Sequence, residues 1–159
     1  LSDTSTNIGG MTRWLDPDEA RAWRGYRSMR ALLDLQLARD LMRDSGLSEP
    51  DYDVLSTLGE TGGNRMRLTE LAAHMMWSKS RLSHHIARME QRGLVSRDPC
   101  ADDGRGSMVT LTPAGVAAIA AAAPKHVASV REHLIDLLTD DELATLAAIT
   151  ERVVAKLRA

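Results

Sequence analysis

The fold is decided by residues 78–113, which read SKSRLSHHIARMEQRGLVSRDPCADDGRGSMVTLTP. The first part of this stretch carries apolar residues at the four- and three-residue spacing of one helix face: Leu82, Ile86 and Met89. Ser78 stands where an N-cap side chain is needed, and Gly93 stands where a helix stops. The pattern therefore predicts a helix over residues 78–93.

A β-hairpin is expected directly after this helix. Residues 94–98 and 107–111 have the extended character of short strands, and the polar, glycine-bearing run between them suits a hairpin tip. On the other side, residues 68–75 predict another short helix, with Thr69 as its cap. Two short helices joined by a tight turn form a helix-turn-helix candidate.

Three further helix starts are marked by capping boxes, in which an acidic side chain reaches back to the cap residue. They are DPDE at residues 16–19, SEPD at 48–51 and TDDE at 139–142. The first of these helices is expected to stop at Ser45-Gly46. Residues 1–15, which precede it, are rich in small polar residues without periodicity and are expected to form a mobile tail.

The segment after the hairpin is also helical in composition. Thr112 is in place to cap it, with proline at the first helical position. Pro124 lies inside the segment, and a kink or a break near Ala123 is expected because proline cannot donate a backbone hydrogen bond.

The composition limits the classes of protein to consider. With 159 residues and 43% hydrophobic residues, the chain is long enough for one domain with an appended helical part. The single cysteine, Cys100, excludes an intramolecular disulfide and a cysteine-rich zinc site. No run of 18 apolar residues and no signal peptide is present, so we expect a cytoplasmic protein with no membrane partner.

Charge is distributed unevenly along a chain whose net charge is −2. Residues 64–106 contain eight basic and five acidic residues, while the rest of the chain is acidic on balance. A locally basic segment in an acidic frame suits a DNA-facing module on a scaffold. Ordinary scatter of charges is the alternative explanation.

The predicted helix over residues 78–93 has a polar face opposite its apolar stripe. That face carries side chains that can donate to or accept from base edges and phosphates: Lys79, Ser80, Arg81, Ser83, His84 and Arg88. We expect the N-terminal half of this helix to enter the major groove, with His84 facing DNA and His85 packed inside. A solvated helix face that happens to be basic is the alternative.

The hairpin tip offers a second DNA contact. Arg105 stands between two glycines and can lie against a narrow minor groove, where the potential is most negative. Asp103 can hold the guanidinium of Arg105 in position.

These elements and their order resemble the MarR (multiple antibiotic resistance regulator) family of winged helix-turn-helix transcriptional regulators. The matching stretches are residues 71–72, 80–89, 93–95, 103–105 and 109–115. The resemblance implies a mainly α fold with a small β-hairpin wing, in which a winged helix-turn-helix head joins a helical dimerisation region. It divides the chain into residues 1–15 as a disordered tail, 16–46 as the first dimerisation helix, 47–112 as the DNA-binding domain and 113–159 as the C-terminal dimerisation helices.

The resemblance further implies a homodimeric, sequence-specific regulator of double-stranded DNA with a roughly palindromic operator. It implies a repressor that a small aromatic effector releases, with helix 78–92 in the major groove and wing 98–107 in the minor groove. The residues expected to contact DNA are Arg67, Thr69, Ser78, Lys79, Ser80, Arg81, Ser83, His84, Arg88, Arg97, Asp103 and Arg105. Trp23, Tyr26 and Tyr52 are candidates to line an effector pocket, although core filling is the commoner role for such residues.

Two other functions compete with this interpretation. An enzyme is disfavoured because the sequence contains no metal-binding motif, phosphate loop or nucleophile elbow, and no cofactor is expected. A helix-turn-helix module that binds only protein stays open because the chain is acidic overall. Arginines at two different tips, Arg81 and Arg105, favour DNA over a protein partner.

Overall fold

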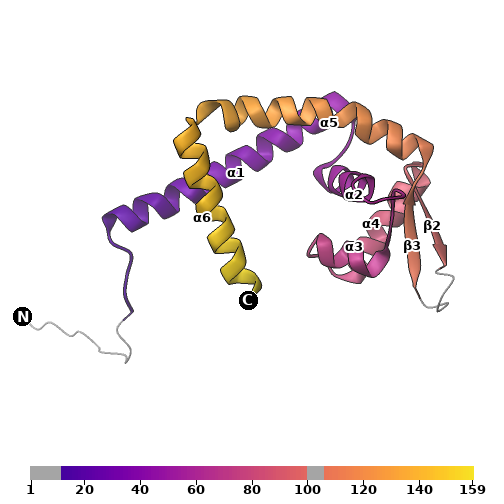
Figure 1. Cartoon of the computed structure of the whole chain (residues 1–159), viewed down its shortest axis with the longest axis horizontal. Coiled ribbons are helices and arrows are strands. Elements are labelled where there is room, and N and C mark those ends of the chain that lie inside the picture. The colour runs from indigo at the N-terminus through magenta and orange to yellow at the C-terminus, as the bar shows by residue number, and fades with distance from the viewer. Residues whose placement is uncertain (1–11, 100–105) are drawn as a thin grey trace, which may run out of the picture.

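The sequence forms a helical chain with one small sheet, described by a computed structural model for residues 12–99 and 106–159 (Figure 1). Its elements, in order, are α1 (Pro17–Ser45), α2 (Glu49–Gly59), β1 (Arg65–Arg67), α3 (Leu68–His74), α4 (Lys79–Gln91), β2 (Val95–Pro99), β3 (Ser107–Leu111), α5 (Pro113–His133), the 3₁₀ turn η1 (Ile135–Leu137) and α6 (Asp140–Arg158). The prediction of a mainly α fold with a small β wing is confirmed.

The helix starts follow the capping signals closely. Capping boxes are formed at Asp16, Ser48 and Thr139, and the side chains of Ser78 and Thr112 also accept backbone hydrogen bonds at their helix starts. At the end of α1, Gly46 adopts the left-handed conformation at φ 67°, as a helix stop requires.

One local prediction is wrong, and another is decided only in part. Thr69 does not cap α3, because β1 runs directly into this helix and Arg67 is the N-cap residue, with no side-chain cap bond. Of the kink or break expected near Ala123, the break is absent, since α5 continues through Pro124 to His133, and the kink stays a prediction. Pro124 is exposed and removes a single backbone donor, a loss that a helix of 21 residues can absorb.

The wing is part of a three-stranded antiparallel sheet in the order β1-β3-β2. The hairpin pairs Val95 with Leu111 and Arg97 with Val109, and β1 adds Met66 opposite Val109 on the other side of β3. The hairpin was predicted, but β1 was not, because three residues are too few to show a period.

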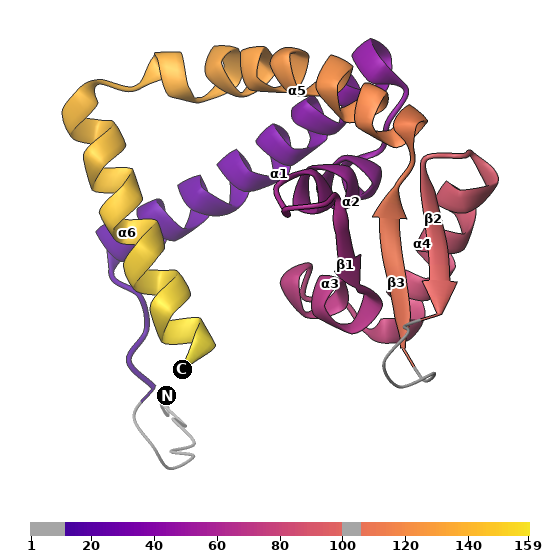
Figure 2. The ribbon, with the colours of Figure 1, turned by 45° about the vertical axis from the view of Figure 1, so that its right-hand side comes forward.

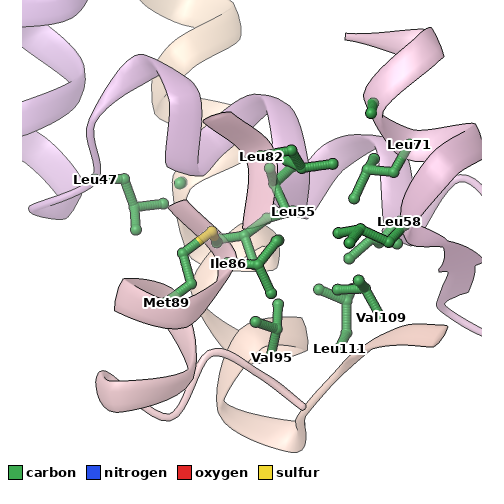
Figure 3. Close-up of a cluster of buried hydrophobic side chains, with 14 of the residues drawn as sticks. Leu47, Leu55, Leu58, Leu71, Leu82, Ile86, Met89, Val95, Val109 and Leu111 are labelled. Carbon is green, nitrogen blue, oxygen red and sulfur yellow. The ribbon is translucent and has the colours of Figure 1, made fainter. Parts of the chain in front are cut away.

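The segment from α2 to β3, here called the head, supplies most of the hydrophobic core, which Leu41 of α1 and Ala122 of α5 complete. Side chains from the helices and the sheet meet there, as Figure 3 shows, and the fully buried ones include Leu55, Leu58, Leu71, Leu82, Ile86, Met89 and Val109. At Gly115, the backbone of α5 approaches the head closely. A Cβ at that position would collide with the carbonyl oxygen of Leu94, so the approach requires glycine.

The other end of the molecule is more open. The N-terminal part of α1 and all of α6 lie away from the head in both ribbon views, and α5 runs between the two ends (Figures 1 and 2). We call these two segments, α1 residues 17–35 and α6, the arms. No residue of α6 is buried, and neither is any residue of the α1 arm.

A buried polar joint connects the C-terminal part of α1 with α5. The Asp40 carboxylate accepts hydrogen bonds from Ser129 Oγ at 2.8 Å and Arg43 Nη1 at 2.6 Å, and it lies 2.9 Å from His133 Nε2. The hydrogen bond from Ser129 holds the pKa of Asp40 well below its usual range, helped by Gln36, His133 and Arg43 and opposed by burial. The joint fixes α1 against α5 through a charged acceptor.

Across the residues described, no helix combines the length and apolar character needed to cross a membrane.

Candidate nucleic-acid interface

Helix α4 presents a polar face because its other face is locked into the head. Leu82, Ile86 and Met89 are fully buried, as the spacing predicted. The predicted contact residues Lys79, Ser80, Arg81, His84 and Arg88 are exposed, while Ser83 is half-buried. Five of the six predicted contact residues on this helix are therefore available to a partner together.

The start of α4 is held by the residues just before it. Ser78 Oγ accepts a hydrogen bond from the backbone N–H of Arg81 at 3.2 Å. The guanidinium carbon of Arg81 lies 3.9 Å from the centroid of a Trp77 ring, a cation–π contact. Both the backbone and the side chain of Arg81 are thus tied to residues 77–78.

His85 packs inside the head while His84 faces outward, as expected. Arg88 Nη2 lies 3.0 Å from His85 Nδ1, and because arginine can only donate, Nδ1 is the acceptor. His85 Nε2 lies 3.2 Å from Asp51 Oδ1, without an aligned hydrogen bond. Burial lowers the pKa of His85, and the cationic Arg88, Arg92 and Arg81 lower it further against the opposing effect of Asp51.

Asp51 ties the end of α4 to the start of α2. Arg92 Nη1 donates to its carboxylate at 2.7 Å, and Asp51 Oδ2 also accepts from the backbone of Ser48 in the capping box. Although burial opposes it, these hydrogen bonds lower the pKa of Asp51. The charged pair fixes the orientation of α4 in the head.

The wing is connected to α4 by two of the predicted contact residues. Arg97 on β2 donates from Nη1 to Ser83 Oγ at 3.0 Å, and both side chains are half-buried. They hold α4 and the wing in a fixed relation. The tip residues Asp103 and Arg105, and also Cys100, lie outside the described residues.

The remaining predicted contacts lie beside α4. Ser78 is the exposed cap of α4, Thr69 is exposed in the first turn of α3, and Arg67 is half-buried at the end of β1. The structure thus brings the helix residues together on one side of the head.

The aromatic residues proposed for an effector pocket are not brought together. Tyr52 is half-buried against His126, with ring centroids 4.4 Å apart, and lines a hollow of about 350 Å³ between α2 and α5. Trp23 and Tyr26 stack on each other in the exposed α1 arm, 5.9 Å apart, and do not line that hollow.

Comparison with known proteins identifies relatives over the same segment that carries the polar face of α4. The family model described as "MarR family" matches residues 47–107, which include the helix-turn-helix. Transcriptional regulator HosA of Escherichia coli O127:H6 is 33% identical over 102 residues, covering 64% of this chain and 73% of HosA. The chain belongs to the MarR family. Its membership bears out the expectation of a transcriptional regulator rather than an enzyme.

Two solved MarR-family regulators from Streptomyces coelicolor extend the likeness to nearly the whole chain. AbsC has a TM-score of 0.88 at 44% identity, covering 92% of this chain and 99% of its own. Sco3205, solved in complex with DNA, has a TM-score of 0.90 at 37% identity, covering 95% and 94%. The fold of this MarR-family chain therefore matches these solved structures over nearly its whole length, and not only over the head.

Sequence reasoning missed the residues that support the polar face. Trp77 could have been noticed as an aromatic side chain directly before an N-cap and four residues before an arginine. Asp51 was noticed only as a capping residue, and its pairing with Arg92 joins positions 41 residues apart, which no local pattern signals.

Proposed function

We propose that this MarR-family regulator is a homodimer that binds double-stranded DNA sequence-specifically in the cytoplasm. The observation that carries the proposal is the exposed polar face of α4, whose opposite face is fully buried in the head. Such a helix can enter the major groove without unfolding anything. Arg81 is then suited to the paired acceptors of guanine, and Lys79, Ser80, His84 and Arg88 to further base and phosphate contacts.

The wing is proposed to add a minor-groove contact through Arg105, with Asp103 beside it. Ser78, Thr69 and Arg67 border α4 and would contact phosphates. Ser83 and Arg97, which bond to each other, would set the spacing between helix and wing. The complex of Sco3205 with DNA makes this kind of partner the natural one for a chain of the same fold.

Dimerisation is proposed to use the arms, with residues 16–46 and 113–159 as the dimerisation region and 47–112 as the DNA-binding domain. The arms expose large apolar side chains that a second chain would cover: Trp23, Tyr26, Met29, Leu32, Leu143, Ile149, Val153, Val154 and Leu157. A two-fold dimer presents two α4 helices to successive major grooves about 34–36 Å apart, so the operator would be roughly palindromic.

Repression relieved by a small aromatic effector is proposed to act through the hollow between α2 and α5. The described residues that line it include Tyr52, Glu60 and Asn64, and no basic side chain is among them. An uncharged or cationic aromatic molecule would suit this lining. If the head can take two arrangements relative to α5, a ligand bound in the hollow would shift the equilibrium between them by its difference in affinity for the two. Trp23 and Tyr26 would contribute only from the dimer interface.

The test is selection of bound duplexes from a random pool by the full chain. An enriched inverted repeat is the expected result, and Arg81→Ala should weaken binding to it by about 1–3 kcal/mol while relaxing one base preference. Equal loss on enriched and random duplexes would reduce Arg81 to a phosphate contact. Failure to enrich any sequence would favour a module that binds protein instead of DNA.

A further inference from the structure

The arginine best placed to read a base is already held in one orientation before any partner arrives. An exposed arginine on a helix surface ordinarily samples many rotamers, and fixing them costs binding free energy. Arg81 instead has its guanidinium 3.9 Å from the centroid of a Trp77 ring, although the side chain is exposed.

Trp77 is itself anchored. Its backbone N–H donates to the carbonyl of Ala72 at 2.9 Å, which closes the turn between α3 and α4. Its ring meets the buried His85 edge-on, with centroids 5.5 Å apart and an interplanar angle of 83°. The indole also packs against the head core. The surface under Arg81 is therefore part of the folded head.

Stacking leaves the arginine competent for recognition. A guanidinium over an aromatic ring engages its flat face, while its N–H donors point outward in its own plane. Bidentate recognition of guanine uses those in-plane donors. The contact with Trp77 and a contact with a base edge can coexist.

We propose that Trp77 is a positioning residue for DNA recognition, holding the guanidinium of Arg81 over its indole ring in the orientation that reads a base. This inference rests on the proposed function. It assigns a specificity role to a residue that would not itself touch a base. The turn before α4 would then contribute to base recognition through Trp77.

The experiment uses the full chain and the duplex that the wild type enriches. Trp77→Leu removes the aromatic face but keeps apolar bulk, and Trp77→Phe keeps a ring. We expect Trp77→Leu to weaken binding to the enriched duplex by about 3- to 10-fold, the cost of ordering one long side chain. The base preference that relaxes should be the one that Arg81→Ala relaxes, and Trp77→Phe should recover most of the affinity.

A double-mutant cycle separates positioning from mere structural support. In the Arg81→Ala background, Trp77→Leu should have almost no further effect on binding. In the Arg88→Ala background, the matched control, it should keep its full effect, since the cation–π contact described for Trp77 is with Arg81 and not with Arg88.

An equal fold-loss from Trp77→Leu in the wild-type and Arg81→Ala backgrounds would overturn the inference and leave Trp77 a packing residue. Tighter binding by Trp77→Leu would also overturn it, because the stack would then hold Arg81 off the DNA. If the wild type binds duplexes but the cycle is additive, only the role of Trp77 fails. If the wild type selects no duplex, the proposed function fails and this inference with it.

Discussion

The head and the arms are made of similar helices but are stabilised in different ways. In the head, Leu82 and Ile86 on α4 are fully buried by contacts within one chain. In the arms, Val153 on α6 remains 49% exposed and Leu157 80% exposed. A regular apolar stripe therefore does not say what covers it. The apolar stripe of the head is covered within one chain, whereas the apolar side chains of the arms are left uncovered by their own chain.

The largest expected effect comes from placing a charge among the exposed apolar side chains of α6. Val153→Asp should abolish the dimer at micromolar concentration, because two-fold symmetry places the change twice and each lost apolar contact is worth about 1.5–3 kcal/mol. Sedimentation equilibrium over a range of concentrations measures it. Ala148→Asp, which puts the same charge on the opposite face of α6, should leave the dimer intact. A Val153→Asp chain that still dimerises would show that α6 is not at the interface.

Removing a buried side chain from the head should have a large effect on the free energy of unfolding. Leu82→Ala should lower the free energy of unfolding by about 2–5 kcal/mol, the usual cost of removing a buried leucine side chain. Urea unfolding followed by circular dichroism measures the loss. Val127→Ala, at a position of α5 that is 54% exposed, should change stability by no more than about 0.5 kcal/mol. Similar losses in the two variants would contradict a tightly packed core around Leu82.

Acid should weaken the joint between α1 and α5, the two helices that connect the head with the arms. Because the folded-state pKa of Asp40 lies below its ordinary value of 3.8, the ionised carboxylate stabilises the fold above that value. That contribution is lost as pH falls below 3.8 toward the lower folded-state pKa. Asp40→Asn should therefore be less stable than the wild type at pH 7, and the gap should narrow on acidification.

Unfolding curves from pH 7 down to about pH 2 measure this gap, which should close mainly below pH 3.8. Ser129→Ala, which removes one hydrogen bond to Asp40 and leaves the charge, should give a smaller gap of the same shape. A gap that is constant across the pH range would mean that Asp40 does not act through its ionisation.

The smallest effect concerns backbone strain within the head. Met76, in the turn before α4, has φ 54°, a left-handed conformation that is unfavourable for a long side chain. Met76→Gly should stabilise the chain by about 0.5–1 kcal/mol, because relief of strain outweighs the entropy that glycine adds to the unfolded state. Asn64→Gly, at φ 55°, should gain less, since asparagine tolerates this conformation. Thermal unfolding of both variants checks the order.

The sequence predicts most of the fold because its signals are local. Serine, threonine and aspartate caps mark helix starts, and the spacing of Leu82, Ile86 and Met89 marks the buried face of α4. Features that depend on distant partners were not predictable. β1 exists because β3 pairs with it, and the buried Asp40 joint exists because α5 brings Ser129 against α1.

The candidate site shows the same division. The outward face of α4 could be assigned from its composition, but the groups that hold it could not. Asp51 and Arg92 act through a contact across the head, and Trp77 is placed under Arg81 by the turn between α3 and α4. The roles of Asp103 and Arg105 remain predictions.

The two outer strands of the small sheet also determine how copies of the chain can meet. A strand with a free backbone edge invites another strand to pair with it, which leads to open-ended aggregates. Here one edge, β1, is only three residues long and carries Arg65 and Arg67, while the other, β2, ends in Arg97, Asp98 and Pro99. Charge, shortness and proline all discourage pairing of this kind. At high concentration the edges of the sheet should therefore resist open-ended strand pairing, and the dimer proposed above would use the helices instead.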